Sequence, residues 1–204
     1  WRRSVTPTMK KSALSATRTL ATNNTVMFLY GLSAVLIGPT LPGMIDDLSL
    51  SLGEGGFVSS MQNAGGFVGA VVALFIADRL SRPGTVLVSF GLLALALVGV
   101  GLSRGYLALI LTFAATGLFI RILDVMLNAH TGQVGNAPAM SRLHMFFSLG
   151  AFVGPLVARA VMDAGSGWTD VYRSVGAVYL VAMVVARPWL QRYLRRPKPE
   201  AGGE

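Results

Sequence analysis

The sequence predicts an all-α membrane protein with six transmembrane helices, arranged as two inverted three-helix repeats. Hydrophobic residues make up 53% of the chain and charged residues 13%, and the mean hydropathy is +0.61. This leaves too little polar surface to cover a soluble core. The apolar residues form long continuous runs, whereas a membrane β-barrel would alternate apolar and polar residues with a period of two. Helices that cross a bilayer are therefore expected.

Each apolar run is close to the roughly 20 residues that a helix needs to cross the hydrocarbon layer. The six runs lie at about 26–45, 56–77, 85–102, 106–127, 143–162 and 171–189. They divide the chain into an N-terminal segment at 1–24, a transmembrane domain at 25–190 and a linker or tail at 191–204. Basic residues and prolines in that last segment are typical of a linker.

An internal repeat relates the two halves of the transmembrane domain. Residues 65–100 align without a gap with residues 150–185 and are identical at 13 of 36 positions, where chance in this composition gives about one in ten. The shift passes over three apolar runs, an odd number, so equivalent helices must cross the membrane in opposite directions. The repeats are expected at about 25–103 and 106–190. Inverted repeats are typical of secondary transporters.

Basic residues predict the orientation in the membrane. Of the 17 Lys and Arg residues, 13 lie before the first span, after the sixth, or in the loops on that same side, and only Arg104 and Arg173 lie in the opposite loops. The positive-inside rule then places both termini in the cytoplasm, with the protein in the plasma or inner membrane. The net charge of +8 follows from this topology, since no basic face with base-reading groups predicts nucleic-acid binding.

Aromatic residues at the predicted helix ends are expected to anchor the protein at the membrane interface. These residues are Tyr106, Trp168, Tyr172 and Trp189.

Three polar residues interrupt the fourth apolar run. Arg121, Asp124 and Asn128 follow the spacing i, i+3, i+7, which places them on one stripe of a helix. A charge at the bilayer centre costs at least roughly 2.5 to 3.5 kcal/mol, so such residues predict a substrate or proton pathway. A structural ion pair between Arg121 and Asp124 is the alternative. The stripe lies near the middle of the membrane if the helix runs to about Val134, and nearer the cytoplasm if it ends near Leu127.

Other polar residues within the apolar runs are candidates for the same pathway. They are Tyr30, Ser33, Gln62, Asn63 and His144. Hydrogen bonds that hold the helices together are the alternative role for them. Because the stripe combines one acid, one base and an amide, the expected substrate is a neutral sugar or a similar small polar solute.

Small residues one helical turn apart predict close helix packing. Gly65 and Gly69 form one such pair, and Gly150 and Gly154 form its counterpart in the second repeat. Pro155 follows directly and is expected to bend or loosen its helix.

The sequence predicts no enzyme and no bound metal or cofactor. Residues 101–105 fit the motif G-x-S-x-G, but the topology puts both histidines on the side of the membrane opposite Ser103. The chain has no cysteine, and it carries no nucleotide-binding or metal-binding motif. Its expected partners are a small-molecule substrate and the lipid bilayer.

Two segments resemble a known family. Ala77, Asp78 and Arg79, followed by Arg82, are similar to the loop signature between the second and third helices of the major facilitator superfamily. Within that superfamily, the fucose permease branch is the closest in motif. The residues that carry this likeness are Leu-Asp-Val-Met-Leu-Asn at 123–128, then Arg142, then Phe-Phe-Ser-Leu-Gly-Ala at 146–151.

The resemblance implies the N-terminal half of a major facilitator fold, with a missing C-terminal half or a second copy to complete the substrate cavity. It assigns a cytoplasmic gate to Asp78, Arg79, Arg82 and Arg142. Asp124 then stands where the sugar permeases carry a functional acid, His144 is a cavity residue, and Gly38 replaces the coupling acid of the first helix. A drug or metabolite efflux transporter, or a non-transporting six-helix structural or assembly protein, are the alternative functions.

Overall fold

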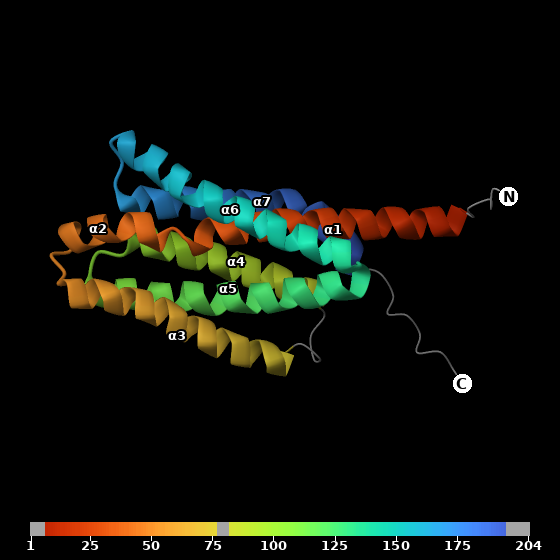
Figure 1. Cartoon of the computed structure of the whole chain (residues 1–204), viewed down its shortest axis with the longest axis horizontal. Helices are drawn as coiled ribbons and strands as arrows, with labels where there is room; N and C mark the ends of the chain where they lie inside the picture. Colours follow the sequence, from red (N-terminus) through yellow and green to blue (C-terminus); the bar gives the residue numbers. More distant parts are fainter. Residues whose placement is uncertain (1–6, 77–81, 195–204) are drawn as a thin grey trace.

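A computed structural model of the chain describes residues 7–76 and 82–194, and every regular element in these ranges is an α-helix (Figure 1). The helices are α1 Pro7–Ala34, α2 Ile37–Asp47, α3 Leu52–Ile76, α4 Arg82–Leu102, α5 Tyr106–Val134, α6 Ala137–Asp163 and α7 Trp168–Leu194.

The first predicted span is made of two helices. α1 and α2 are separated by a turn at Val35 and Leu36. Pro39 explains the break, because it has no N–H to offer the carbonyl group of Val35 and its ring clashes with that group in a regular helix. The N–H of Gly38 donates to the Val35 carbonyl instead, at 3.3 Å. Together the two helices still form one continuous span, Thr17–Asp47.

Among the residues that the structure describes, five segments are long and apolar enough to cross a membrane. They are Thr17–Asp47, Leu52–Ile76, Gly84–Leu102, Tyr106–Gln133 and Ala137–Asp163, and they coincide with the first five predicted runs. α7 covers the sixth run but does not reach the same apolarity over its described residues, since Asp170 and Arg173 lie in its first two turns. The architecture is that of a multi-pass helical membrane protein.

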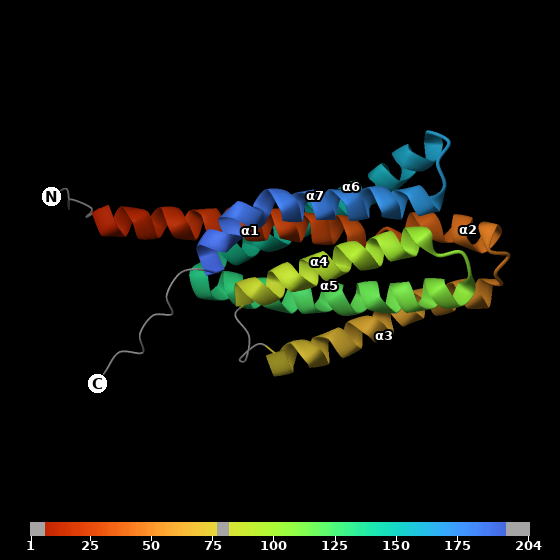
Figure 2. The same ribbon diagram turned by 180° about the vertical axis from the view of Figure 1, so that it is seen from behind.

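Consecutive spans run in opposite directions along the bundle, as the two views show (Figure 1, Figure 2). The most extensive contacts join α3 with α5, α1 with α6 and α4 with α7. In the two repeats, α1 is equivalent to α5, α3 to α6 and α4 to α7. The pair α3 and α5 is therefore equivalent to the pair α6 and α1, and the pair α4 and α7 is equivalent to itself. The packing therefore reproduces the inverted repeat that the sequence predicts.

The glycines of α3 bring its backbone against α5. A Cβ atom on Gly65 would overlap the carbonyl oxygen of Ala114, and one on Gly69 would overlap that of Leu118. Gly117 of α5 meets α3 in the same way. Only residues without a side chain fit this separation, as expected where small residues set the distance between membrane helices.

The second repeat has the equivalent contact between α6 and α1. A Cβ atom on Gly150 would overlap the carbonyl oxygen of Phe28, and one on Gly31 would overlap that of Phe147. Gly154 lies against the next turn of α1. α6 remains one continuous helix through Pro155.

The start of α7 is buried against α2. The indole Nε1 of Trp168 donates to Asp47 Oδ2 at 2.8 Å, and the hydroxyl groups of Tyr172 and Thr40 lie 3.2 Å apart. Trp168 and Tyr172 are both almost completely buried. The expectation that they anchor the protein at the membrane interface is therefore wrong, because α2 folds over the positions at which they would meet lipid.

Candidate functional site

The polar stripe lies well inside a transmembrane helix. α5 is unbroken from Tyr106 to Val134, so Asp124 is preceded and followed by several helical turns. The helix thus extends to Val134, the length for which the stripe is expected nearer the middle of the membrane. At that depth an unpaired charge would be costly, so the partners of these side chains matter.

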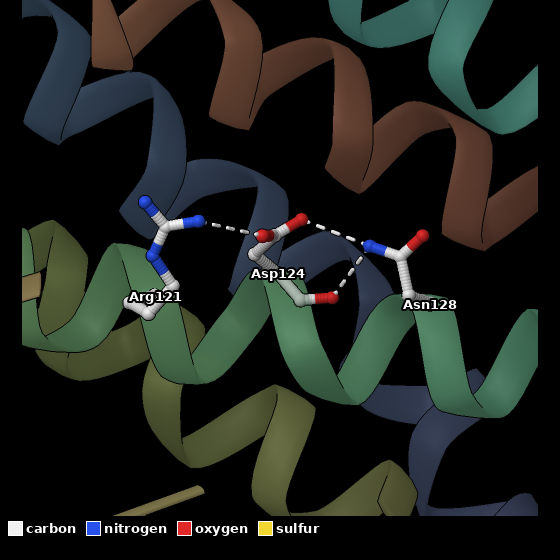
Figure 3. A network of polar contacts seen from close by, with 3 residues as sticks. All are labelled: Arg121, Asp124 and Asn128. Carbon is white, nitrogen blue, oxygen red and sulfur yellow. Dashed lines mark hydrogen bonds and ion pairs between the residues drawn. The ribbon is translucent and has the colours of Figure 1, made fainter. Parts of the chain in front are cut away.

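The three side chains of the stripe are joined in a row along α5 (Figure 3). Nη1 of Arg121 lies 3.1 Å from Oδ2 of Asp124. The amide Nδ2 of Asn128 donates to Oδ1 of Asp124 and to its backbone carbonyl oxygen, both at 2.9 Å. Asp124 is thus held between a cation on one side and an amide on the other.

This row lies on an open face of the six-helix unit. The side chain of Arg121 is 47% exposed and that of Asp124 is 20% exposed. Charged side chains that faced lipid directly would carry a large free-energy penalty, so this face requires either water or a protein partner in the membrane.

Helices α1 and α3 flank the row on α5. Arg121 lies beside Gly66 of α3, because a Cβ atom at Gly66 would be 4.0 Å from the guanidinium Nε. Tyr30 of α1 is close enough to Asp124 and Arg121 to interact electrostatically with both. Its ring packs on Phe147 of α6, with centroids 4.9 Å apart. The polar row thus lies between α1 and α3, and Tyr30 forms part of its buried side.

The other predicted pathway residues lie around this region with different environments. Asn63 is exposed on α3, and its amide donates to the carbonyl oxygen of Ser59 in its own helix at 3.0 Å. Gln62 is half-buried, and its backbone carbonyl packs on Gly117. His144 is exposed on α6, one turn before Phe147.

Ser33 does not contribute to this face. It is buried, and its hydroxyl group is hydrogen-bonded to that of Tyr179 at 2.8 Å. Holding helices together was the alternative role considered for it, and this contact between α1 and α7 is of that kind.

The predicted gate is only partly covered by the described residues. Asp78 and Arg79 lie outside them. Arg82 is the first residue of α4, and Arg142 is exposed in the second turn of α6. The starts of α4 and α6 lie at the same end of the bundle (Figure 1).

A buried polar cluster joins α1 to α5 and was not anticipated from the sequence. The amide Nδ2 of Asn23 donates to Oγ1 of Thr131 at 2.9 Å and lies 3.4 Å from Nδ1 of His130. All three residues are buried. One signal was present: Thr131 follows Asn128 by three residues and so extends the polar stripe of the fourth run.

Among the described residues, no group of three or more His, Asp or Glu side chains is placed to hold a metal ion. In the described part of the chain, the hydrogen bonds and the ion pair of the polar row all lie within α5.

Residues 25–204 match the family model of the Major Facilitator Superfamily. The chain belongs to the major facilitator superfamily. It is 28% identical over 136 residues to sodium-dependent glucose transporter 1 of Homo sapiens. It is also 26% identical over 148 residues to an Arabidopsis thaliana protein assigned as a glycerol-3-phosphate transporter. Each match covers 65% of the chain.

The printed names of both relatives are those of transporters of small solutes. The matched regions make up 26% and 28% of the two relatives. The chain therefore spans about a quarter of the length of these superfamily members.

Proposed function

We propose that the chain forms the N-terminal half of a secondary active transporter that moves a sugar-like, small polar solute by alternating access. The observation that carries this proposal is the row of Arg121, Asp124 and Asn128 on an open face of the bundle. Polar and charged groups at membrane depth mark substrate and ion pathways by default. The names of the two relatives refer to glucose and to glycerol 3-phosphate, which are both small polyhydroxylated compounds.

In this proposal a C-terminal half, or a second copy, covers the open face and encloses the substrate near the middle of the membrane. The pathway residues are Tyr30, Gln62, Asn63, Arg121, Asp124, Asn128 and His144. Inverted repeats favour such a mechanism, since two similar units can exchange conformations and open the cavity to each side in turn.

The proposed topology places both ends of the chain in the cytoplasm. Arg18, which is exposed near the start of the first span, and Arg142 then lie on the cytoplasmic side, in agreement with the positive-inside rule. The loop that contains Asp78, Arg79 and Arg82 lies on the same side, and we assign to it, with Arg142, the role of a gate that contacts the other half.

The proposal is tested by reconstituting the complete gene product into liposomes and measuring the uptake of radiolabelled D-glucose and glycerol 3-phosphate. Saturable uptake of one of them, absent from empty liposomes, is expected. Export that exceeds uptake in everted vesicles would favour efflux instead. A folded protein that moves neither solute in either direction would contradict the transport function and favour a structural or assembly role.

A further inference from the structure

Each oxygen of the Asp124 carboxylate group accepts a hydrogen bond from its own helix. Oδ2 accepts from Arg121 at 3.1 Å and Oδ1 accepts from Asn128 at 2.9 Å. A substrate hydroxyl group would have to compete with two donors that are already in place. In its observed arrangement, Asp124 serves to hold its two neighbours rather than to meet a solute.

Arg121, in contrast, presents unused donors. Within the described part of the chain, its guanidinium group makes a single hydrogen bond, to Asp124. The remaining N–H groups lie on a side chain that is 47% exposed. The amide nitrogen of Asn128 already donates to two oxygens of Asp124. The row therefore offers the cavity a cationic, donor-rich group rather than an acidic one.

A buried glycine of α3 adjoins this guanidinium group. Gly66 lies beside it, and a Cβ atom at this position would meet only ordinary contacts, 3.7 Å from the Gly117 carbonyl oxygen and 4.0 Å from Arg121 Nε. Helix packing therefore does not demand a glycine here, in contrast to Gly65 and Gly69, where backbone atoms leave no room. A side chain larger than alanine at this position would begin within 4.0 Å of Arg121 Nε.

We propose that the substrate carries an oxyanion, a carboxylate or phosphate group on a small polyol, and that Arg121 binds it while Asp124 acts as a positioning residue. This inference rests on the proposed transport function, and it replaces the neutral sugar predicted from the sequence with an anionic polyol. A planar guanidinium fork binds carboxylate and phosphate groups through paired hydrogen bonds, which are about twice as strong as neutral ones. When the cavity is empty, Asp124 neutralises Arg121 and fixes its orientation.

The test measures thermal stabilisation of the complete, detergent-purified gene product by three probes at equal ionic strength: D-gluconate, glycerol 3-phosphate and D-glucose. We expect at least one of the two anions to bind about tenfold or more tightly than D-glucose, as a charge-assisted contact implies. The carboxylate and phosphate probes distinguish the two kinds of oxyanion.

Variants assign the roles. Arg121→Gln is expected to weaken anion binding at least about tenfold, and Arg121→Lys, which keeps the charge but loses the planar fork, to weaken it less. Asp124→Asn should keep the affinity within about threefold or tighten it, because it removes a competing anion.

Gly66→Leu should block binding while Gly66→Ala preserves it. Arg159→Gln is the matched control, since Arg159 forms an exposed ion pair with Asp163 at 2.9 Å.

Two results would overturn this inference and leave transport intact. One is saturable D-glucose binding and uptake that Arg121→Gln does not change. The other is loss of binding in Asp124→Asn with full binding in Arg121→Gln, which would make Asp124 the contact residue. Failure of all three probes to bind or to enter liposomes, with a folded protein, would contradict the proposed function as well.

Discussion

The hydroxyl groups of Ser33 in α1 and Tyr179 in α7 share a hydrogen bond of 2.8 Å inside the bundle. Two further contacts follow along the first span at intervals of seven residues: Thr40 with Tyr172, and Asp47 with Trp168. The first of the three holds α1 and the other two hold α2. The helix broken at Val35 and Leu36 is therefore supported on both sides of the break by α7.

These contacts predict a small stability loss on removing one hydroxyl group. Tyr179→Phe should lower the free energy of unfolding by about 0.6 to 1.5 kcal/mol, because Ser33 keeps its hydrogen bond to the Tyr30 carbonyl oxygen at 3.0 Å. Unfolding followed in mixed micelles measures the change. Tyr106→Phe is the control, since no hydrogen bond from the Tyr106 hydroxyl group occurs among the described residues. A loss well above 2 kcal/mol would show that Ser33 does not retain its second partner.

Helix separation in the two repeats depends on glycine. Gly65→Ala and Gly150→Ala are each expected to destabilise the fold by about 1 to 3 kcal/mol, because the added methyl group would overlap backbone atoms of the facing helix. Gly56→Ala in α3 is the matched control: a Cβ atom added there would have no neighbouring atom within 4 Å, and alanine favours the helix by about 1 kcal/mol. Equal thermal stability of all three variants would contradict the close packing.

The ion pair predicts a separation of net transport from exchange. Asp124→Asn leaves Arg121 without a counter-charge when no substrate is bound. The cost is at least about 2.5 kcal/mol. This corresponds to more than a tenfold slowing of the step in which the empty transporter changes conformation to bind substrate again. Net uptake should fall at least about tenfold, while exchange of internal for external substrate continues, since the bound oxyanion then neutralises Arg121. Asp163→Asn, in the exposed pair with Arg159, is the control. Unchanged net uptake in Asp124→Asn would reduce the pair to a structural role.

Topology is tested with single cysteines, since the chain has none of its own. A cysteine at position 51 would disturb the start of α3, because Ser51 caps this helix and exchanges hydrogen bonds with Glu54. Gly53→Cys, exposed in the first turn of α3, should react in intact cells with a membrane-impermeant thiol reagent. Ser141→Cys, exposed at the start of α6, should be protected until the cells are opened. The reverse pattern would invert the bundle and remove the assignment of a cytoplasmic gate.

Much of the fold could be predicted from local composition. Apolar runs of about 20 residues can only become helices in a bilayer, since the backbone must satisfy its own hydrogen bonds. The 85-residue repeat, carried by residues such as Gly65 and Gly150, predicted the symmetry of the helix pairs. The spacing of Arg121, Asp124 and Asn128 placed all three on one face, because helical periodicity is a local property.

Only the tertiary structure decided which neighbour each side chain meets. Trp168 and Tyr172 have the composition of interface anchors, but α2 covers them, and no local pattern records that cover. Gly31 and Gly117 became packing residues only when the facing helices supplied carbonyl groups opposite them. Likewise, the sequence could pair Arg121 with Asp124 but could not show that both carboxylate oxygens are occupied. Hydrogen bonds and close contacts depend on distances between segments far apart in the chain, and these are fixed only when the helices pack.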